Sequence, residues 1–216
     1  MLELIKKHKL IVIIRNIDKD DIIPLCEALY DGGVRLAEIT FSQKQSRDEE
    51  TAQSIMLAAK HFLGRMSIGA GTVLTERQVE LTYAAGGKFI ISPNTNEAVI
   101  KKTKELGLTS LPGALTPTEI VTAYSYGADL VKIFPAGDLG SKYINAIKAP
   151  LSGIPLLAVG GVDLHNLPDF LDSGVYGVGI GSNIIQKDFI KRKDFSSISR
   201  LAHEYVSLLE AHSIKD

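Results

Sequence analysis

The chain has 216 residues, of which 45% are hydrophobic and 23% are charged, and its formal net charge is -1. This length suits one α/β-barrel domain, which typically needs about 200 residues or more and can bury a substantial core. The near-neutral charge gives no indication of the basic surface that binding to nucleic acid or anionic lipid requires. No apolar run reaches membrane-spanning length, so we expect a cytoplasmic protein with neither membrane nor nucleic-acid partners.

Short β-branched runs alternate along the chain with segments of helical periodicity. The predicted strands are Leu10–Ile14, Leu36–Thr40, Ser67–Ala70, Phe89–Ser92, Leu108–Leu111, Leu130–Phe134, Leu156–Val159 and Val175–Ile180. The predicted helices are Lys19–Asp31, Ser46–Phe62, Glu76–Ala85, Glu97–Leu106, Pro117–Tyr126, Ser141–Leu151, Leu164–Asp172 and Ser196–Ala211. Strand–helix units repeated without a break in composition predict a single-domain (β/α)8 TIM barrel over residues 1–216. The alternative is an open doubly wound sheet, which the uniformity of the units disfavours.

Helix starts carry recognisable capping patterns. Thr116, Pro117 and Glu119 have the spacing of a capping box with proline at the first helical position. The segments 75–78 and 94–97 repeat the capping-box spacing. These signals support the predicted helix boundaries.

Lys132 lies in the apolar run LVKIFP. Strand residues alternate between the two faces, so Val131 and Ile133 would face the helices and Lys132 would point into the barrel. Desolvation there lowers the pKa of an ammonium and frees the amine as a nucleophile toward carbonyls. The alternative is a lysine that merely pairs with a carboxylate, which the rarity of buried lysines disfavours.

Glu38, in the run RLAEITF, is the expected partner of Lys132. The same alternation places Glu38 inside the barrel and Ala37 and Ile39 outside. A carboxyl group in that cavity can move protons during Schiff-base formation and at the carbon next to a carbonyl. A plain Lys132–Glu38 ion pair is the structural alternative.

Two polar residues follow the first and third predicted strands. Arg15 ends the run IVIIR, where a guanidinium is suited to bind a carboxylate. Thr72, in IGAGTVL, places a hydroxyl where it can hold a water or a substrate oxygen. The alternatives are an ordinary solvated arginine and a turn or capping threonine.

Glycine clusters follow the last two predicted strands, at Gly160-Gly161 and at Gly179 to Ser182. Glycine allows close approach of the backbone to an anion, and the loops after strands seven and eight are the recurrent phosphate site of this barrel. The combination indicates a phosphate site. Tight turns alone are the alternative.

Other kinds of site are disfavoured. Cys26 is the single cysteine and lies in an apolar helical pattern, so it is expected to be a buried structural residue. No pair of histidines has zinc-ligand spacing, which disfavours a metal-dependent enzyme. We therefore expect neither metal nor cofactor.

Six segments of the chain together resemble one enzyme family. The segments are IGAGTVL, IISPN, LPGALTPTE, VKIFPAGDLG, VGGV and VGIGS. They are similar to the signature segments of the 2-dehydro-3-deoxy-phosphogluconate (KDPG) and 4-hydroxy-2-oxoglutarate (KHG) aldolases, and the resemblance runs from about Leu10 to about Ser182. It implies a homotrimeric, metal-free TIM barrel that reversibly cleaves a phosphorylated 2-keto-3-deoxy acid to pyruvate and glyceraldehyde 3-phosphate.

The resemblance also implies roles for individual residues. Lys132 would form the Schiff base and Glu38 would be the general acid and base. The pyruvate site would be lined by Thr72, Pro93 and Phe134, with Arg15 binding the carboxylate, and the phosphate would be held by Gly160, Gly161, Gly181 and Ser182.

Two positions depart from the gluconate-type pattern of this family. Ser42 stands where that pattern has a carboxylate-binding arginine, so binding is expected to rely on Arg15 or on backbone donors. Val159 stands where gluconate-type members carry a threonine that contacts a substrate hydroxyl. A valine there resembles the branch that acts on 2-dehydro-3-deoxy-6-phosphogalactonate, and a methyl group cannot supply the hydrogen bond that selects the other epimer.

Three alternative functions stay open at this stage. One is a KHG aldolase, and another is a phosphosugar epimerase or isomerase in which Glu38 is the base and Lys132 an electrostatic stabiliser. The third is a non-catalytic sensor of sugar-acid phosphates, which would bind ligand without Lys132. An intact Glu38–Lys132 pair disfavours the sensor.

Overall fold

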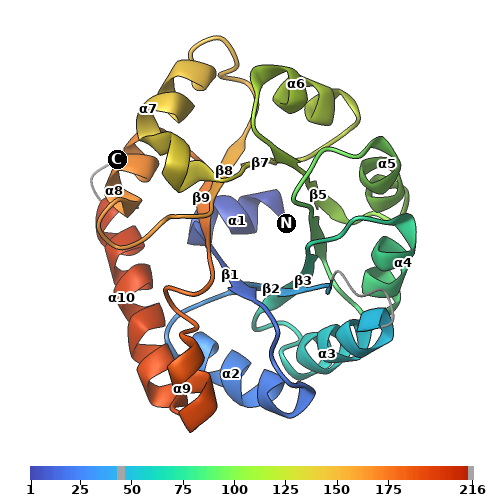
Figure 1. Ribbon diagram of the computed structural model, residues 1–216, viewed down its shortest axis with the longest axis vertical. Coiled ribbons are helices and arrows are strands. Elements are labelled where there is room, and N and C mark those ends of the chain that lie inside the picture. Colours follow the sequence, from blue (N-terminus) through green and yellow to red (C-terminus); the bar gives the residue numbers. More distant parts are fainter. Residues whose placement is uncertain (43–46, 214–216) are drawn as a thin grey trace.

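The computed structural model describes residues 1–42 and 47–213. Its strands are β1 (Leu10–Ile14), β2 (Leu36–Thr40), β3 (Ser67–Gly71), β4 (Phe89–Ile91), β5 (Thr109–Leu111), β6 (Gly113–Ala114), β7 (Val131–Ile133), β8 (Leu156–Val159) and β9 (Gly177–Ile180). Its helices are α1 (Leu2–His8), α2 (Lys19–Asp31), α3 (Asp48–His61), α4 (Glu76–Ala84), α5 (Glu97–Glu105), α6 (Pro117–Ser125), α7 (Ala136–Lys148), α8 (Leu167–Asp172), α9 (Lys187–Arg192) and α10 (Phe195–Ser213). Figure 1 shows the helices arranged around a ring of strands.

The parallel strands close into a barrel through one interrupted strand. Within the described residues, nine strands follow the order β5-β4-β3-β2-β1-β9-β8-β7-β6. Only Pro112 separates β5 from β6 in the chain, and proline cannot donate to the ladder. Its carbonyl still accepts a hydrogen bond from the backbone N–H of Lys132 at 2.9 Å. Because β5 and β6 act as one broken strand, the ring is an eight-stranded barrel and the expected fold is confirmed.

Alternation along each strand divides the apolar core into two parts. Inside the barrel, an apolar cluster includes Leu36, Phe89 and Leu157, while residues such as Ala37 and Val131 face the helices. A Cβ at Gly69 would lie only 2.4 Å from Cδ2 of Phe89, so glycine at this position makes room for the ring.

Helix α1 closes the end of the barrel at which the strands begin. It directly precedes β1, and Figure 1 shows it lying across the middle of the ring. Ile5 is fully buried and belongs to the apolar cluster inside the barrel. The opposite end of the barrel, where the strands terminate, is the end left for a site.

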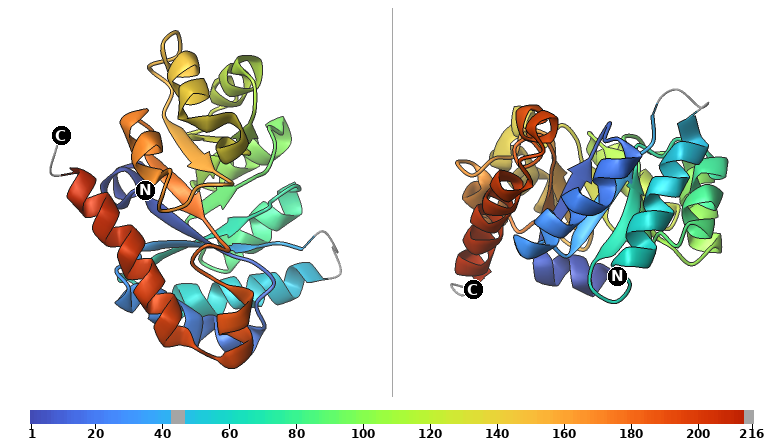
Figure 2. Two further views of the ribbon diagram at one scale, coloured as in Figure 1. Left: turned by 60° about the vertical axis from the view of Figure 1, so that its left-hand side comes forward. Right: turned by 90° about the horizontal axis from the view of Figure 1, so that it is seen from below.

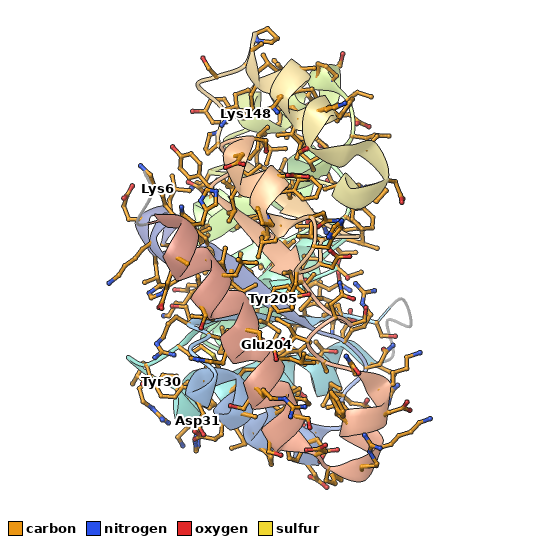
Figure 3. The ribbon with its side chains drawn as sticks, turned by 90° about the vertical axis from the view of Figure 1, so that its left-hand side faces the viewer. Lys6, Tyr30, Asp31, Lys148, Glu204 and Tyr205 are labelled. Carbon is orange, nitrogen blue, oxygen red and sulfur yellow. The ribbon has the colours of Figure 1, made fainter. Side chains whose placement is uncertain are left out.

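The C-terminal helix α10 covers one side of the barrel next to α2 (Figure 2). Figure 3 shows Glu204 and Tyr205 in the middle of α10 and Tyr30 and Asp31 at the end of α2. A Cβ at Gly32 would lie 2.6 Å from Cβ of Ala202, so the two helices pack too closely there for a larger residue.

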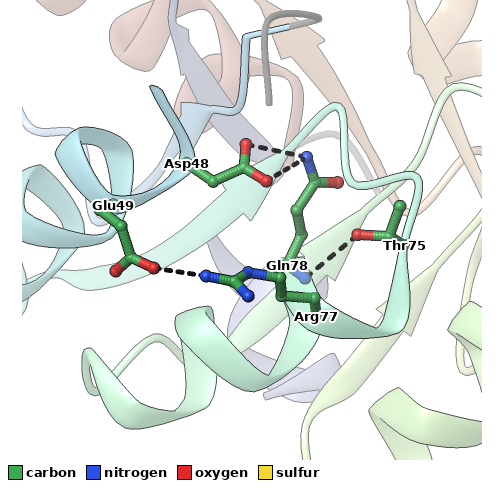
Figure 4. A network of polar contacts seen from close by, with 5 residues as sticks. All are labelled: Asp48, Glu49, Thr75, Arg77 and Gln78. Atoms are coloured by element: carbon green, nitrogen blue, oxygen red, sulfur yellow. Dashed lines mark hydrogen bonds and ion pairs between the residues drawn. The ribbon is translucent and has the colours of Figure 1, made fainter. Parts of the chain in front are cut away.

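A buried polar network joins α3 to α4 and to the loop after β3 (Figure 4). The side-chain amide of Gln78 donates to the two carboxylate oxygens of Asp48 at 3.1 and 3.3 Å, and its oxygen accepts from the N–H of Leu74 at 2.8 Å. On the surface, Arg77 pairs with Glu49 at 2.8 Å. The buried bonds fix the loop after β3 relative to both helices, and this loop begins at the end of the barrel described above.

Several element boundaries differ from those predicted. Helix α7 begins at Ala136 rather than Ser141 because two helical pieces join across Gly140, whose φ is 75°. Asn96, not Asn94, caps α5. Helix α8 begins after a turn in which Asp163 accepts two backbone hydrogen bonds. The predicted start at Ser46 lies outside the described residues.

Two short helices, α1 and α9, were not predicted, whereas the capping box of α6 is present as expected.

Among the described residues, no helix combines the length and the apolar character needed to span a bilayer.

Candidate active site

A cavity of about 700 Å³ opens at the end of the barrel where the strands terminate. The residues predicted as a site lie within or just after several strands and all line it: Arg15, Glu38, Thr72, Pro93, Lys132, Phe134, Val159, Gly160, Gly161, Gly181 and Ser182. Parallel strands in a barrel all end on the same face, which is why residues so far apart in the sequence meet there. The structure therefore brings the whole predicted set together.

Lys132 is the central residue of β7 and points into the cavity, with only 7% of its surface exposed. Its neighbours Val131 and Ile133 belong to the helix-facing core, as the alternation predicts. Burial is the main cause that lowers the pKa of the Lys132 ammonium; Glu38 opposes this shift and Arg15 reinforces it. The amine is thus shifted toward the neutral form that attacks carbonyls.

Glu38 is the central residue of β2 and is 2% exposed. Burial raises the pKa of its carboxyl group to about 7, although Lys132 and then Arg15 act to lower it. Its Oε2 is buried and makes no hydrogen bond with any residue in the described part of the chain. A carboxyl group that is near half ionised at neutral pH can both accept and donate a proton.

Lys132 and Glu38 influence each other's pKa without binding each other. Their strands are separated in the barrel by β1, β9 and β8. In the part of the chain that the structure describes, they form neither a hydrogen bond nor an ion pair, and the Lys132 Nζ lies 4.6 Å from the ring centroid of Phe134. The structural alternative of a plain Lys132–Glu38 ion pair is therefore absent, and the space between them is part of the cavity.

Arg15 and Thr72 form a second polar group on the cavity wall. A guanidinium nitrogen of Arg15 donates to Oγ1 of Thr72 at 3.3 Å. Thr72 has a φ of 56°, a left-handed conformation that a β-branched residue adopts only under constraint from its surroundings. The neighbouring N–H of Val73 donates to the carbonyl of Ile91 at 3.2 Å, which helps to hold this conformation. Together the two side chains offer donors suited to a carboxylate.

The glycine pair after β8 has a packing role that is visible in the backbone. Gly160 and Gly161 have φ values of 85° and 73°. The N–H of Gly137 donates to the carbonyl of Gly160 at 2.7 Å, and a Cβ at Gly161 would lie 2.9 Å from Cα of Gly137. Tight packing explains why both positions are glycine. Because neither residue has a side chain, their backbone lines the cavity directly.

Several residues of the cavity wall escaped prediction from sequence. They include Asn16, Leu74, Asn183, Lys187, Ile190 and Lys191. The last three lie on α9, whose short charged segment KDFIKR has no helical apolar periodicity that could have revealed it. Ser42 lines a different cavity of about 350 Å³, together with Arg47, so neither side chain lies on the wall of the main cavity.

Comparison with known proteins gives a consistent assignment. The family model described as KDPG and KHG aldolase matches residues 1–201. A 2-dehydro-3-deoxy-6-phosphogalactonate aldolase of Escherichia coli K12 is 35% identical over 95% of each chain, and a 2-dehydro-3-deoxy-phosphogluconate aldolase of Haemophilus influenzae is 33% identical over 97% of each.

Solved structures agree with this assignment. A structure described as native KDPGal is 33% identical, covers 94% of this chain and 95% of its own, and superposes with a TM-score of 0.85. A KDPG aldolase of Legionella pneumophila, solved with pyruvate captured as a covalent carbinolamine intermediate, is 27% identical over 94% of this chain and 97% of its own, with a TM-score of 0.84. The chain belongs to the KDPG and KHG aldolase family of carbon–carbon lyases.

Proposed function

We propose that this protein is a class I aldolase that reversibly cleaves a 2-dehydro-3-deoxy-6-phospho-sugar acid to pyruvate and D-glyceraldehyde 3-phosphate. The observation that carries the proposal is the pair of buried groups in one cavity: burial lowers the pKa of Lys132 and raises that of Glu38. A covalent carbinolamine of pyruvate in the Legionella relative supports the same chemistry here.

The first half of the reaction builds an imine on Lys132. The neutral Nζ attacks the C2 ketone of the substrate and forms a carbinolamine. Glu38, in its protonated form, donates a proton to the departing hydroxyl, and water leaves as the protonated imine forms. The imine is then an electron sink next to the bond that breaks.

The second half cleaves the C3–C4 bond. Glu38, now ionised, accepts the proton of the C4 hydroxyl, through a water, and the C3–C4 electrons move into the imine to give an enamine. The aldehyde product leaves. Protonation of the enamine at C3 and hydrolysis of the resulting imine release pyruvate and regenerate the Lys132 amine.

Recognition of the two anionic ends is assigned to two different groups of residues on the cavity wall. Arg15, held by Thr72, binds the pyruvate carboxylate and replaces the arginine that is absent at Ser42. Pro93 and Phe134 pack against the pyruvate moiety. The bare backbone of Gly160, Gly161 and Gly181, with the Ser182 hydroxyl, holds the phosphate.

The galactonate epimer is the proposed substrate. Val159 is 3% exposed and lines the cavity, and its side chain cannot hydrogen-bond a substrate hydroxyl. The E. coli relative named for the galactonate substrate is 35% identical and the Haemophilus relative named for the gluconate substrate is 33% identical, a difference too small to choose between them, so the preference rests on Val159.

Borohydride trapping tests the Schiff base. Reduction of the protein with pyruvate should attach a carboxyethyl group to Lys132 alone, as read by peptide mass spectrometry. The Lys132→Arg variant, which keeps a long basic side chain and lacks the amine nucleophile, should trap nothing and release no pyruvate. Active protein with an unmodified Lys132 peptide would exclude the proposed mechanism, and an epimerase would also leave this peptide unmodified.

Assembly as a homotrimer is part of the proposal. Val121 and Tyr124 lie three residues apart on α6 and are each 45% exposed. Leu115 and Phe134, each 40% exposed, line one cavity together with other residues of α6. Exposed apolar side chains gathered in one region support association with further copies. Sedimentation of the protein at trimer mass tests this, and a monomer would refute it.

We also propose a cytoplasmic location. Cys26 is buried, and burial raises the pKa of its thiol to about 12, so the group is protonated and inert near neutral pH. A structural cysteine of this kind is compatible with a reducing compartment.

A further inference from the structure

Helix α9 presents two lysines to the rim of the active-site cavity. Lys187, Ile190 and Lys191 all line the cavity, and spacings of three and four residues place them on one face of the helix. Arg192, the last residue of the same helix, does not line the cavity; it lies over the ring of Phe189, 5.6 Å from its centroid. One face of α9 is therefore part of the site.

The position of α9 is fixed at both ends. Before the helix, Ile184 and Ile185 are buried, and their N–H groups donate to the carbonyl of Gly181 at 3.0 and 2.9 Å. After it, Lys193 is bonded to Asp21 on α2. The lysines of α9 are thus held close to the Gly181–Ser182 turn that is proposed to bind phosphate.

The charge of the cavity wall is strongly unbalanced. Arg15, Lys132, Lys187 and Lys191 line it, and among the described residues of its wall Glu38 is the one acidic side chain. Neither α9 lysine forms an ion pair with a residue in the described ranges 1–42 and 47–213. Because the whole chain carries a formal charge of -1, this excess of cations is local to the cavity.

We propose that Lys187 and Lys191 bind the phosphate of the substrate from the solvent side and set the preference for phosphorylated acids. This inference rests on the proposed function. The substrate would carry one carboxylate and a phosphate with a charge of about −1.5 to −2 near neutral pH. The charges of Lys132 and Glu38 offset each other. The remaining three cations of the cavity wall, Arg15, Lys187 and Lys191, therefore match the negative charge of the substrate.

The lysines would contribute what the glycine loops cannot. Backbone N–H groups supply directed hydrogen bonds but no net charge, whereas two flexible ammonium groups neutralise the dianion and attract it over a distance. Removing the two lysines should therefore raise KM and lower kcat/KM for phosphorylated substrates, and this effect should weaken as salt is added.

The test compares Lys187→Ala, Lys191→Ala and the double variant with Arg192→Ala, which removes one positive charge from the same helix away from the cavity. Pyruvate release is measured with 2-dehydro-3-deoxy-6-phosphogalactonate and with the same acid lacking phosphate. For the double variant we expect kcat/KM to fall about 10- to 30-fold on the phosphorylated acid, mainly through KM, and less than about twofold on the other. Arg192→Ala should stay within about twofold on both.

The inference is overturned if kcat/KM of the double variant falls equally on both acids, or if it does not fall on the phosphorylated acid. If the wild-type protein releases no pyruvate from either acid, the proposed function fails instead. Calorimetric titration with glycerol 3-phosphate then tests whether the two lysines bind phosphate. Binding that is about tenfold weaker in the double variant than in wild type and Arg192→Ala supports the inference, and equal binding refutes it.

Discussion

The carboxylate of Glu38 occupies the space that a side chain at Gly71 would need. An ideal Cβ at Gly71 would lie 2.4 Å from Oε1 and 2.5 Å from Cδ of Glu38. Gly71 ends β3, which pairs with β2, the strand that carries Glu38. A residue with no expected role in chemistry therefore sets the position of the proposed proton carrier.

Gly71→Ala should lower activity without unfolding the barrel. The added methyl group must push the Glu38 carboxylate aside, and a displacement of about 1 Å in a catalytic group can cost about 100-fold in rate. We expect kcat to fall about 10- to 100-fold while the circular dichroism spectrum is kept.

Gly153→Ala is the matched control, because a Cβ at Gly153 meets no atom within 4 Å. Its kcat should stay within about twofold of wild type, as for a surface substitution. Equal kcat in the Gly71→Ala variant would show that the carboxylate position is unimportant.

The rate should depend on the ionisation of Glu38. Its pKa is raised to about 7 by burial, so the ionised form needed to accept the C4 hydroxyl proton accumulates as pH rises through 7. The protonated form is needed earlier, to expel water from the carbinolamine, so we expect kcat/KM to rise with pH to a maximum and to fall again at higher pH, with the apparent pKa values belonging to the coupled Glu38–Lys132 pair.

Glu38→Gln keeps the shape of the side chain and removes its proton chemistry. Its kcat should fall by about 100-fold or more, and the acid limb near pH 7 should disappear from the profile measured between pH 5 and 9. An unchanged acid limb in this variant would assign the titration to another group.

Much of this site could be predicted because strand alternation is a strong constraint. Once Lys132 and Glu38 are placed in the centres of apolar strands, the period of two fixes both side chains inside the barrel. The capping box at Thr116 was equally readable, since its hydrogen bonds are local.

Features that depend on distant contacts could not be read from the chain. The break at Pro112 is visible only once β5 and β6 pair with different neighbours. The lysines of α9 look like an ordinary solvated run in sequence, and only the tertiary position of the helix turns them toward the cavity. The close approach of the Glu38 carboxylate to Gly71 likewise arises from strand register, which local patterns do not specify.

Thr72 combines a useful hydroxyl with an unfavourable backbone conformation. Its φ of 56° is the left-handed region, which costs a residue with a Cβ about 1 kcal/mol or more and costs glycine nothing comparable. Thr72→Gly should therefore be more stable than Thr72→Ala by about 1 kcal/mol in urea unfolding.

Both Thr72 variants lose the hydroxyl that accepts the hydrogen bond from Arg15, so both should weaken pyruvate binding to a similar extent, about 5- to 10-fold in the concentration needed for borohydride trapping. Thr72→Ser, which keeps the hydroxyl, should bind pyruvate nearly as well as wild type. Tight binding in the glycine variant would show that the hydroxyl has no part in recognition.

Val159→Thr should shift the choice between the two substrate epimers. Val159 is buried on the cavity wall, and Gly179 leaves space for its branched side chain, since a Cβ at Gly179 would lie 2.8 Å from Cγ2 of Val159. Threonine has nearly the same shape, so it fits this space while adding a hydroxyl that can hydrogen-bond the C4 hydroxyl of the gluconate epimer. The ratio of kcat/KM for the gluconate over the galactonate acid should rise about tenfold, the value of one net hydrogen bond.

Val159→Ala is the control for this swap, because it enlarges the same space without adding a hydroxyl. If epimer choice were governed by room alone, alanine would shift the ratio as much as threonine does. If it is governed by hydrogen bonding, alanine lowers kcat/KM for both epimers together and leaves their ratio within about twofold of wild type. Both ratios come from one coupled assay of pyruvate release, so a threonine variant with an unchanged ratio would remove Val159 as the basis of selectivity.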